Sequence, residues 1–221
     1  MTDSSLPWTV VVPVKGTVDS KSRLHPDIAD GDRMRLAEAF TLDALAALTA
    51  ASRVASIIVV TDPTTSLATQ LGRNGVRIMG DPGLGLNGAI VDGLRAAGGT
   101  RPLAVLLGDL PSLTPEAVDD ALTAAEAHPL AVVPDADGTG TTLLTAATAA
   151  PPVPRFGAGS AAAHAAAGHR ILAFPPDSPI RRDVDTAADL EAAVALGVGA
   201  HTRAALAALS PRRASGPSPR R

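Results

Sequence analysis

Short runs of apolar residues alternate along this chain with longer stretches in which apolar residues recur every third or fourth position. The short runs predict buried β-strands, and the longer stretches predict helices with one apolar face. The first pair is a strand from Trp8 to Val14 followed by a helix from Arg33 to Ala51. Further strands are expected at 57–61, 76–79, 103–107, 131–134, 142–145 and 171–174, and further helices at 66–71, 86–97, 115–127 and 186–196.

This alternation predicts an α/β fold with a mixed, mostly parallel, doubly wound sheet that helices cover on both faces. The stretch from Ala136 to Ala150 interrupts the pattern, and we interpret it as a departure into an antiparallel edge strand. Ligands bind such sheets at the carboxyl ends of the strands. We expect one folded domain over residues 1–209, and a disordered basic tail over residues 210–221.

Composition excludes several classes of function. The chain has no cysteine, which excludes disulfide scaffolds and thiolate chemistry, and aromatic residues are only 2% of it, which disfavours stacking on single-stranded nucleic acid. Without the four arginines of the tail, 15 basic groups face 22 acidic ones, so duplex nucleic acid is not an expected partner. No apolar run is long enough for a membrane span, and we expect a cytoplasmic protein.

The only two lysines of the chain, Lys15 and Lys21, lie together after the first strand, and Arg23 follows them. Elsewhere arginine carries the positive charge. Compact, mobile ammonium groups suit phosphate, so this segment is a candidate phosphate-binding loop. A solvated surface loop would explain the same residues.

Two acidic motifs are candidate metal ligands. Asp109 follows Gly108 at the end of an apolar strand, where a carboxylate could hold a hard cation against phosphates. Asp183 and Asp185 point the same way if their segment is extended, and could converge on one ion. Helix capping is the simpler reading of part of this second motif, with Asp185 or Thr186 as the cap. Asp109 could likewise be a turn residue.

Two further segments carry polar groups beside glycines. The turn that holds Gly157 and Ser160 opens a helix, and its backbone N–H groups and hydroxyl could bind an anion, although a structural turn is the alternative. A tight hairpin would equally explain the glycines around Thr141. Asn87 stands near a helix start, where its amide could read a nucleobase or cap the helix. The five histidines are scattered and are interpreted as surface or packing residues.

Taken in order, these motifs resemble one family. They read Pro-Val-Lys-(x)5-Lys-Ser-Arg-Leu, Leu-Asn-x-Ala-Ile, Gly-Asp-Leu-Pro, Gly-Thr-Gly-Thr, Arg-Phe-Gly-x-x-Ser and Asp-Val-Asp-Thr, and they extend over about residues 8–200. The family is that of the guanylyltransferases that activate phosphoenolpyruvate or 2-phospho-L-lactate in coenzyme F-420 biosynthesis. The resemblance implies a nucleotide-diphospho-sugar transferase (GT-A-like, Rossmann-like) fold.

The resemblance also implies a role for each motif. Magnesium would be held by Asp109, Asp183 and Asp185, and the phosphorylated acid by Thr141, Gly157 and Ser160. Lys15, Lys21 and Arg23 would surround the phosphates of GTP, and Asn87 and Gly108 would lie on the nucleotide side. The expected reaction transfers GMP from GTP to phosphoenolpyruvate or 2-phospho-L-lactate, and gives enolpyruvoyl-2-diphospho-5'-guanosine or lactyl-2-diphospho-5'-guanosine plus pyrophosphate.

Two alternatives stay open at this point. One is a molybdopterin or sugar-nucleotide nucleotidyltransferase, although the chain lacks the glycine-rich Gly-x-Gly-x-Arg loop that such enzymes carry. The other is a non-catalytic nucleotide-binding module. The sequence does not choose between phosphoenolpyruvate, 2-phospho-L-lactate and 3-phosphoglycerate, and it leaves a homodimer open.

Overall fold

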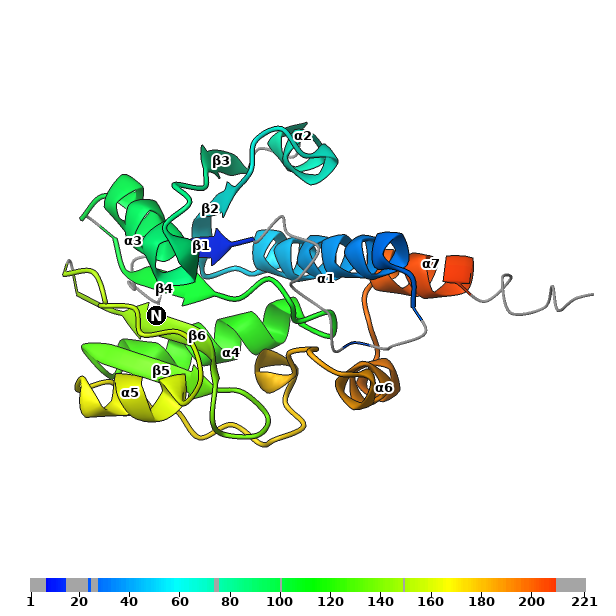
Figure 1. Cartoon of the computed structure of the whole chain (residues 1–221). Helices are drawn as coiled ribbons and strands as arrows, with labels where there is room; N and C mark the ends of the chain where they lie inside the picture. The colour runs from blue at the N-terminus through cyan, green and yellow to red at the C-terminus, as the bar shows by residue number, and fades with distance from the viewer. Residues whose placement is uncertain are drawn as a thin grey trace, which may run out of the picture.

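The computed structural model describes residues 7–14, 24, 28–73, 76–99, 101–148 and 150–209, and Figure 1 shows their arrangement. The basic side chains Lys15, Lys21 and Arg23 lie outside these residues, and so does the 210–221 tail. The predictions made for them therefore stay predictions.

A seven-stranded sheet with the order β3-β2-β1-β4-β6-β5-β7 forms the centre of the fold. All its pairings are parallel except those of β6, which runs antiparallel to both β4 and β5. The expected antiparallel excursion is thus real, but its assignment to an edge was wrong, because β6 lies inside the sheet. The strands are β1 (Trp8–Pro13), β2 (Val54–Thr61), β3 (Arg77–Gly80), β4 (Leu103–Leu106), β5 (Leu130–Pro134), β6 (Thr141–Ala146) and β7 (Arg170–Ile171).

Seven α-helices and a 3-10 turn connect these strands within the described residues. They are α1 (Asp30–Ala50), α2 (Ser66–Arg73), α3 (Gly85–Ala97), α4 (Pro115–Glu126), α5 (Ser160–Ala166), η2 (Pro179–Arg181), α6 (Ala187–Leu196) and α7 (Ala200–Leu209). Local capping signals located the starts of α4 and α6. Thr114 caps α4 by accepting the Ala117 N–H at 3.2 Å, and Thr186 with Asp189 forms a capping box at α6.

The last helix, α7, had no counterpart in the prediction. It packs along α1 (Figure 1), and the Asp43 carboxylate of α1 accepts the backbone N–H groups of His201 and Thr202 at 3.0 and 2.8 Å. The residue that caps α7 therefore lies more than 150 positions earlier in the chain. A cap supplied at that separation leaves no local sequence signal.

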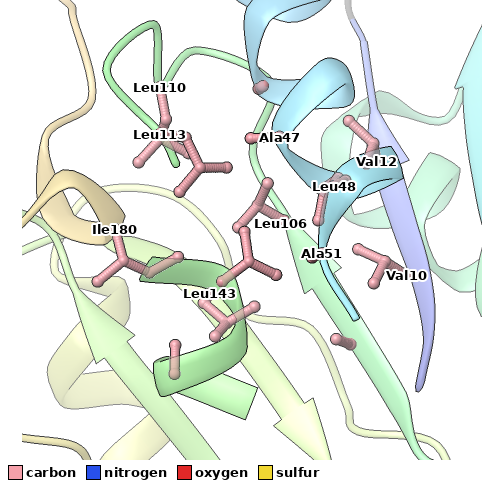
Figure 2. Packing of buried hydrophobic residues seen from close by; sticks show 14 of the residues in the cluster. Val10, Val12, Ala47, Leu48, Ala51, Leu106, Leu110, Leu113, Leu143 and Ile180 are labelled. Carbon is pink, nitrogen blue, oxygen red and sulfur yellow. The ribbon is translucent and has the colours of Figure 1, made fainter. Parts of the chain in front are cut away.

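Alternation along β1 divides the core between the two faces of the sheet. Val10 and Val12 face α1 and α4, whereas Val11 faces α3. Figure 2 shows Val10 and Val12 close to Leu48 of α1, with Leu106 of β4 beside them. Burial of both faces explains why the strands read as continuous apolar runs rather than alternating ones.

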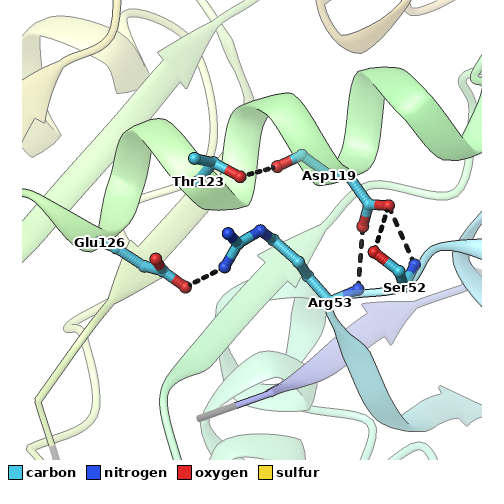
Figure 3. A network of polar contacts seen from close by, with 5 residues as sticks. All are labelled: Ser52, Arg53, Asp119, Thr123 and Glu126. Atoms are coloured by element: carbon cyan, nitrogen blue, oxygen red, sulfur yellow. Dashed lines mark hydrogen bonds and ion pairs between the residues drawn. The ribbon is translucent and has the colours of Figure 1, made fainter. Parts of the chain in front are cut away.

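A polar network joins α4 to the chain just before β2 (Figure 3). The Asp119 carboxylate accepts the backbone N–H groups of Ser52 and Arg53 at 3.0 and 2.9 Å, and the Arg53 guanidinium pairs with Glu126 at 2.5 Å. These contacts fix the amino end of β2 against α4. They therefore lie at the opposite edge of the sheet from the carboxyl ends of the strands. They contribute to the fold rather than to a site.

Close packing between α3 and the sheet depends on Gly93, and it gives a first testable prediction. A Cβ at this position would lie 2.5 Å from Val11 Cγ1 and 2.9 Å from Val60 Cγ2. Gly93→Ala should therefore lower the free energy of unfolding, measured in urea, by about 1–3 kcal/mol. Gly72→Ala on α2 is the matched control, because nothing lies within 4 Å of its Cβ, and it should instead stabilise by up to about 1 kcal/mol. A Gly93→Ala variant as stable as the parent would show that α3 can move away at little cost.

The carboxyl ends of β1, β4 and β5 lie at one edge of the sheet, where antiparallel β6 begins. Val14 follows β1, Asp109 follows β4, Asp135 follows β5, and Thr141 opens β6. Two residues singled out from the sequence, Asp109 and Thr141, are therefore brought to one edge by strand topology. Among the described residues, none of the helices combines the length and apolar character that crossing a bilayer requires.

Candidate functional site

Four aspartates gather at the carboxyl edge of the central strands. Asp109 and Asp135 follow β4 and β5, and the backbone N–H of Val184 donates to the Asp109 carbonyl at 3.1 Å. That hydrogen bond holds the segment containing Asp183 and Asp185 against the end of β4. The side chain of Val184, which separates Asp183 from Asp185 in the sequence, is fully buried. The two acidic motifs predicted to converge thus meet at one place in the fold.

The electrostatics of this cluster appear in the pKa of Asp183. Burial, together with the neighbouring charges of Asp109, Asp135 and Asp185, raises the pKa of Asp183 to about 8. Carboxylates held together in this way favour a proton or a metal cation among them. Their oxygen atoms are the donors that Mg²⁺ prefers. The donor set therefore fits a divalent cation.

The side chains do not, however, form a ready ligand set. Within the part of the chain that the structure describes, no three Asp, Glu or His side chains are spaced to hold one ion. The two acidic segments lie together in the fold, and a shared metal ion held by Asp109, Asp183 and Asp185 stays a prediction. Like charges without a cation repel each other, so rotation of these side chains would have to accompany binding.

Arg181 fixes the chain that leads into this cluster. Its guanidinium donates to backbone carbonyl groups around the end of β5 and before η2, and thereby ties η2 to β5. The acceptors are the carbonyl oxygens of Pro134, Phe174, Asp135 and Ala136, at distances between 2.6 and 3.3 Å. Five donors in a planar fork suit this role, which lysine could not fill. Sequence reasoning passed over Arg181, because its acceptors are backbone atoms and three of the four residues that supply them lie 45 to 47 positions earlier.

Asp135 was also missed, although its position after a buried strand matches that of Asp109. Its carboxylate accepts the backbone N–H groups of Thr139 and Gly140 at 2.9 and 2.7 Å and so shapes the turn before β6. A Cβ on Gly140 would collide with this carboxylate. The glycine at this position is therefore explained by the tight turn, as the hairpin interpretation allowed.

Two hydroxyls adjoin the carboxylate cluster. The Ser160 hydroxyl donates to Thr141 Oγ1 at 3.0 Å, and both residues are almost fully buried. Thr141 precedes Thr142, whose carbonyl accepts the N–H of Leu107, two residues before Asp109. Thr141 thus opens a strand, β6, that pairs with β4, the strand that Asp109 follows, and Ser160 reaches Thr141 from α5.

The backbone around Ser160 offers less to an anion than expected. Helix α5 has only seven residues, and the N–H groups of Ser160 and Ala161 already donate to the carbonyls of Gly157 and Thr139, both at 3.1 Å. Gly157 has φ +138° and Gly159 has φ +69°, so glycine is required at both positions by the turn itself. Because the Ser160 hydroxyl donates to Thr141, the Thr141 hydroxyl is the donor that these contacts leave for an anion.

Asn87 does not cap a helix, which corrects the capping interpretation. Helix α3 begins two residues earlier with Leu84 as its cap residue, and the Asn87 amide clamps the backbone of Phe156 instead. Its Nδ2 donates to the Phe156 carbonyl at 3.0 Å, and its Oδ1 accepts the Phe156 N–H at 2.9 Å. Asn87 therefore positions the chain that leads directly into Gly157.

Gly108 lets α1 approach the end of β4. A Cβ there would lie 3.2 Å from Thr41 Oγ1 and 3.5 Å from Val12 Cγ1. A larger residue at position 108 would push α1 or the start of the Asp109 loop outward.

The capping alternative for the second acidic motif is settled as well, because Thr186 and Asp189 do the capping and Asp183 takes no part in it.

The basic loop leaves the described chain at the same edge. Strand β1 lies between β2 and β4, and the Val14 N–H donates to the Val60 carbonyl at 2.9 Å. Val14 therefore lies at the carboxyl end of β1, the strand next to β4, which Asp109 follows. The structure describes where this loop starts, and the positions of its ammonium groups stay a prediction.

Comparison with known proteins places this arrangement among nucleotidyltransferases. The MobA-like NTP transferase domain family matches residues 34–178. A phosphoenolpyruvate guanylyltransferase from Streptomyces coelicolor is 45% identical over 206 residues, which cover 91% of this chain and 97% of that protein. Another protein of that name, from Geodermatophilus obscurus, is 48% identical, with 90% and 94% of the two chains covered.

Among solved structures, a protein from Desulfovibrio desulfuricans G20 described as a nucleotide-diphospho-sugar transferase superposes with a TM-score of 0.70. It is 19% identical, and the match covers 94% of this chain and 95% of the other. At that identity the match speaks for the fold alone. The sheet order and this match together confirm the nucleotide-diphospho-sugar transferase fold.

Proposed function

This chain belongs to the phosphoenolpyruvate guanylyltransferase family of MobA-like NTP transferases and is a nucleotidyltransferase, and from that premise we propose that it transfers GMP from GTP to phosphoenolpyruvate. The relatives of that name match it over nearly their whole length, which supports this acceptor over a molybdopterin or a sugar phosphate. The role in coenzyme F-420 biosynthesis is part of the same proposal and rests on the motifs of the sequence.

One observation of the structure carries the proposal. The hydroxyls of Thr141 and Ser160 contact each other at the sheet edge where Asp183 and Asp185 also lie. Thr141 opens β6, which pairs with β4, the strand that Asp109 follows, and Ser160 opens α5. Hydroxyl donors suit an anionic acceptor, and carboxylates suit a cation that accompanies a nucleoside triphosphate. Two phosphorylated reactants need both kinds of group side by side.

The proposed reaction needs alignment more than acid–base chemistry. A phosphate oxygen of phosphoenolpyruvate attacks the α-phosphorus of GTP in line, and a new phosphoanhydride bond forms as the bond between the α- and β-phosphates breaks. Pyrophosphate leaves with the bonding electron pair. A phosphate monoester has its second pKa near 6, so it is ionised at neutral pH and needs no general base. The protein's contribution is positioning and neutralisation of charge.

Because the reaction needs neutralisation of charge, we assign the carboxylates to a metal ion. Asp109, Asp183 and Asp185 would hold Mg²⁺, with Asp135 close enough to take part in the charge of the cluster. When bound, the ion would supply charge neutralisation for the phosphates of both reactants. The residues' own task is to keep three carboxyl groups at one sheet edge, and the hydrogen bond from the Val184 N–H to the Asp109 carbonyl holds the two segments together there.

The nucleotide is assigned to the side of Asp109 that faces β1, whereas the phosphorylated acid is assigned to the side that faces β6. Lys15, Lys21 and Arg23 would surround the triphosphate, because they follow β1 in the sequence and β1 pairs with β4. Gly108 would lie on the nucleotide side, where Thr41 of α1 leaves little room for a larger side chain. Asn87 would act on the nucleotide side from α3, through the loop it clamps at Phe156.

Mass spectrometry of the products tests the proposal directly. The purified protein is incubated with GTP, Mg²⁺ and equal concentrations of phosphoenolpyruvate, 2-phospho-L-lactate and 3-phosphoglycerate. We expect enolpyruvoyl-2-diphospho-5'-guanosine to dominate, with one pyrophosphate released for each product molecule. Preference for 2-phospho-L-lactate would keep the reaction and change the acceptor. Binding of GTP without any product from the three acids would contradict the proposed function.

A further inference from the structure

A buried chain of hydrogen bonds lies behind the hydroxyl of Thr141. The Arg155 backbone N–H donates to His164 Nε2 at 2.9 Å, and His164 Nδ1 lies 3.1 Å from Thr141 Oγ1. The Ser160 hydroxyl donates to the same oxygen at 3.0 Å. His164 is completely buried, and it comes from α5, whereas Thr141 opens β6. None of the roles described so far uses this histidine.

The tautomer of His164 follows from its partners. A backbone N–H can only donate, so Nε2 must be the unprotonated nitrogen that accepts from Arg155. In the neutral ring the proton is then on Nδ1 and points at Thr141 Oγ1. Burial, with the charges of His169 and Arg155, lowers the pKa of His164 to about 4, so the ring is neutral at pH 7. Edge-on contacts with Phe156 and His169 hold its plane.

This arrangement decides which way the Thr141 hydroxyl can act. Its oxygen has two lone pairs, and these accept from His164 Nδ1–H and from the Ser160 hydroxyl. The proton of Thr141 therefore has to point away from both partners. With the opposite tautomer, Thr141 would donate to Nδ1 and would turn a lone pair outward instead. A lone pair repels an anion, whereas an O–H binds it.

We propose that His164 is a positioning residue that fixes the Thr141 hydroxyl as a hydrogen-bond donor toward the phosphorylated acid. The inference rests on the proposed function, because it takes the acid to bind at Thr141 and Ser160. It goes beyond that function because it assigns a role in substrate binding to His164, which acts only through Thr141. His164 also anchors the backbone at Arg155, and an experiment has to separate the two tasks.

Two isosteric substitutions separate them. In His164→Asn the amide nitrogen occupies about the place of Nδ1, so the donor to Thr141 is kept and the acceptor for Arg155 is lost. In His164→Gln the amide oxygen reaches about the place of Nε2, so the anchor is kept and the donor to Thr141 is lost. A role in positioning the hydroxyl predicts that asparagine is tolerated and glutamine is not. A purely structural anchor predicts the reverse order.

The readout is the KM for phosphoenolpyruvate against that for GTP. For His164→Gln we expect the KM for phosphoenolpyruvate to rise about tenfold, the effect of weakening one hydrogen bond to a charged group, with the KM for GTP unchanged. For His164→Asn both constants should stay within about threefold of the parent, the range left by replacing one neutral hydrogen bond. His201→Asn on α7, which is exposed, is the matched histidine control. The opposite order of the two His164 variants, or equal impairment of both, would overturn the inference.

A measurement on the unsubstituted protein keeps the inference testable even if a variant does not fold or the protein turns over neither substrate. The ¹⁵N resonances of the five histidine rings report which nitrogen carries the proton, and the His164 signals are identified by their loss in His164→Asn or His164→Gln. We expect the proton on Nδ1, and a proton on Nε2 would overturn the assignment. A protein with the expected tautomer but no product from GTP and the three acids would instead mark a failure of the proposed function.

Discussion

Asp109→Asn is expected to lower kcat/KM by about a thousandfold, the size of effect seen when one group that stabilises transition-state charge is removed. Asparagine keeps the shape of the side chain and removes its charge. Asp109 follows β4 at the sheet edge and is one of the carboxylates that raise the pKa of Asp183. The loss should appear in steady-state kinetics at saturating Mg²⁺ and should fall mainly on kcat.

The fold should survive this substitution. Because Asp109, Asp135, Asp183 and Asp185 repel one another, removal of one charge should leave the melting temperature of the metal-free protein unchanged or higher. Asp120→Asn, an exposed acid on α4, is the matched control and should retain full activity. A thousandfold loss accompanied by a lower melting temperature would point to damage to the fold. Normal turnover by Asp109→Asn would remove Asp109 from the proposed machinery.

Chelation of divalent cations by EDTA is expected to abolish turnover, with a fall of at least a hundredfold. Two unit charges 4 Å apart interact by about 4 kcal/mol at an effective dielectric of 20. An acidic cluster would therefore repel two phosphorylated reactants by an amount that Lys15, Lys21 and Arg23 are not expected to offset alone. Excess Mg²⁺ added after EDTA should restore the rate, and EDTA already saturated with Mg²⁺ should have no effect.

A second measurement ties the metal to the proposed residues rather than to the nucleotide. In the absence of GTP, Mg²⁺ should raise the melting temperature of the parent protein, because a ligand that binds only the folded state stabilises it. The rise should be lost in Asp183→Asn and kept in the Asp120→Asn control. Substantial turnover in EDTA would contradict the metal assignment, and so would an unchanged melting shift in Asp183→Asn.

Much of the candidate site could be predicted because its parts follow strands. Asp109 stands directly after the apolar run of β4, and Thr141 precedes that of β6, so strand topology alone brings them to one edge. The pairing of Thr186 with Asp189 could also be predicted, because a capping box joins residues only three positions apart. Order along the chain and period-two or period-four patterns carry this kind of information.

The residues that were missed act over long separations. His164 looked like a packing residue because its partners, Thr141 and Arg155, come from another strand and from a loop. Arg181 looked like one of many arginines because its acceptors are backbone carbonyls that no side-chain motif marks. Asn87 was singled out as a helix cap or a reader of the nucleobase, but its clamp on a loop 69 residues away was not foreseen.

The amino-acid sequence by itself determined the strands, most of the helices and the fold class of this protein, because these depend on periodicity and on local capping. The tertiary structure alone decided that β6 lies inside the sheet, that Asp43 caps α7, and that His164 sets the polarity of the Thr141 hydroxyl. The physical reason is that strand order and hydrogen-bond direction depend on which distant segments meet. That choice is made by packing of the whole chain and leaves no mark in any short stretch of it.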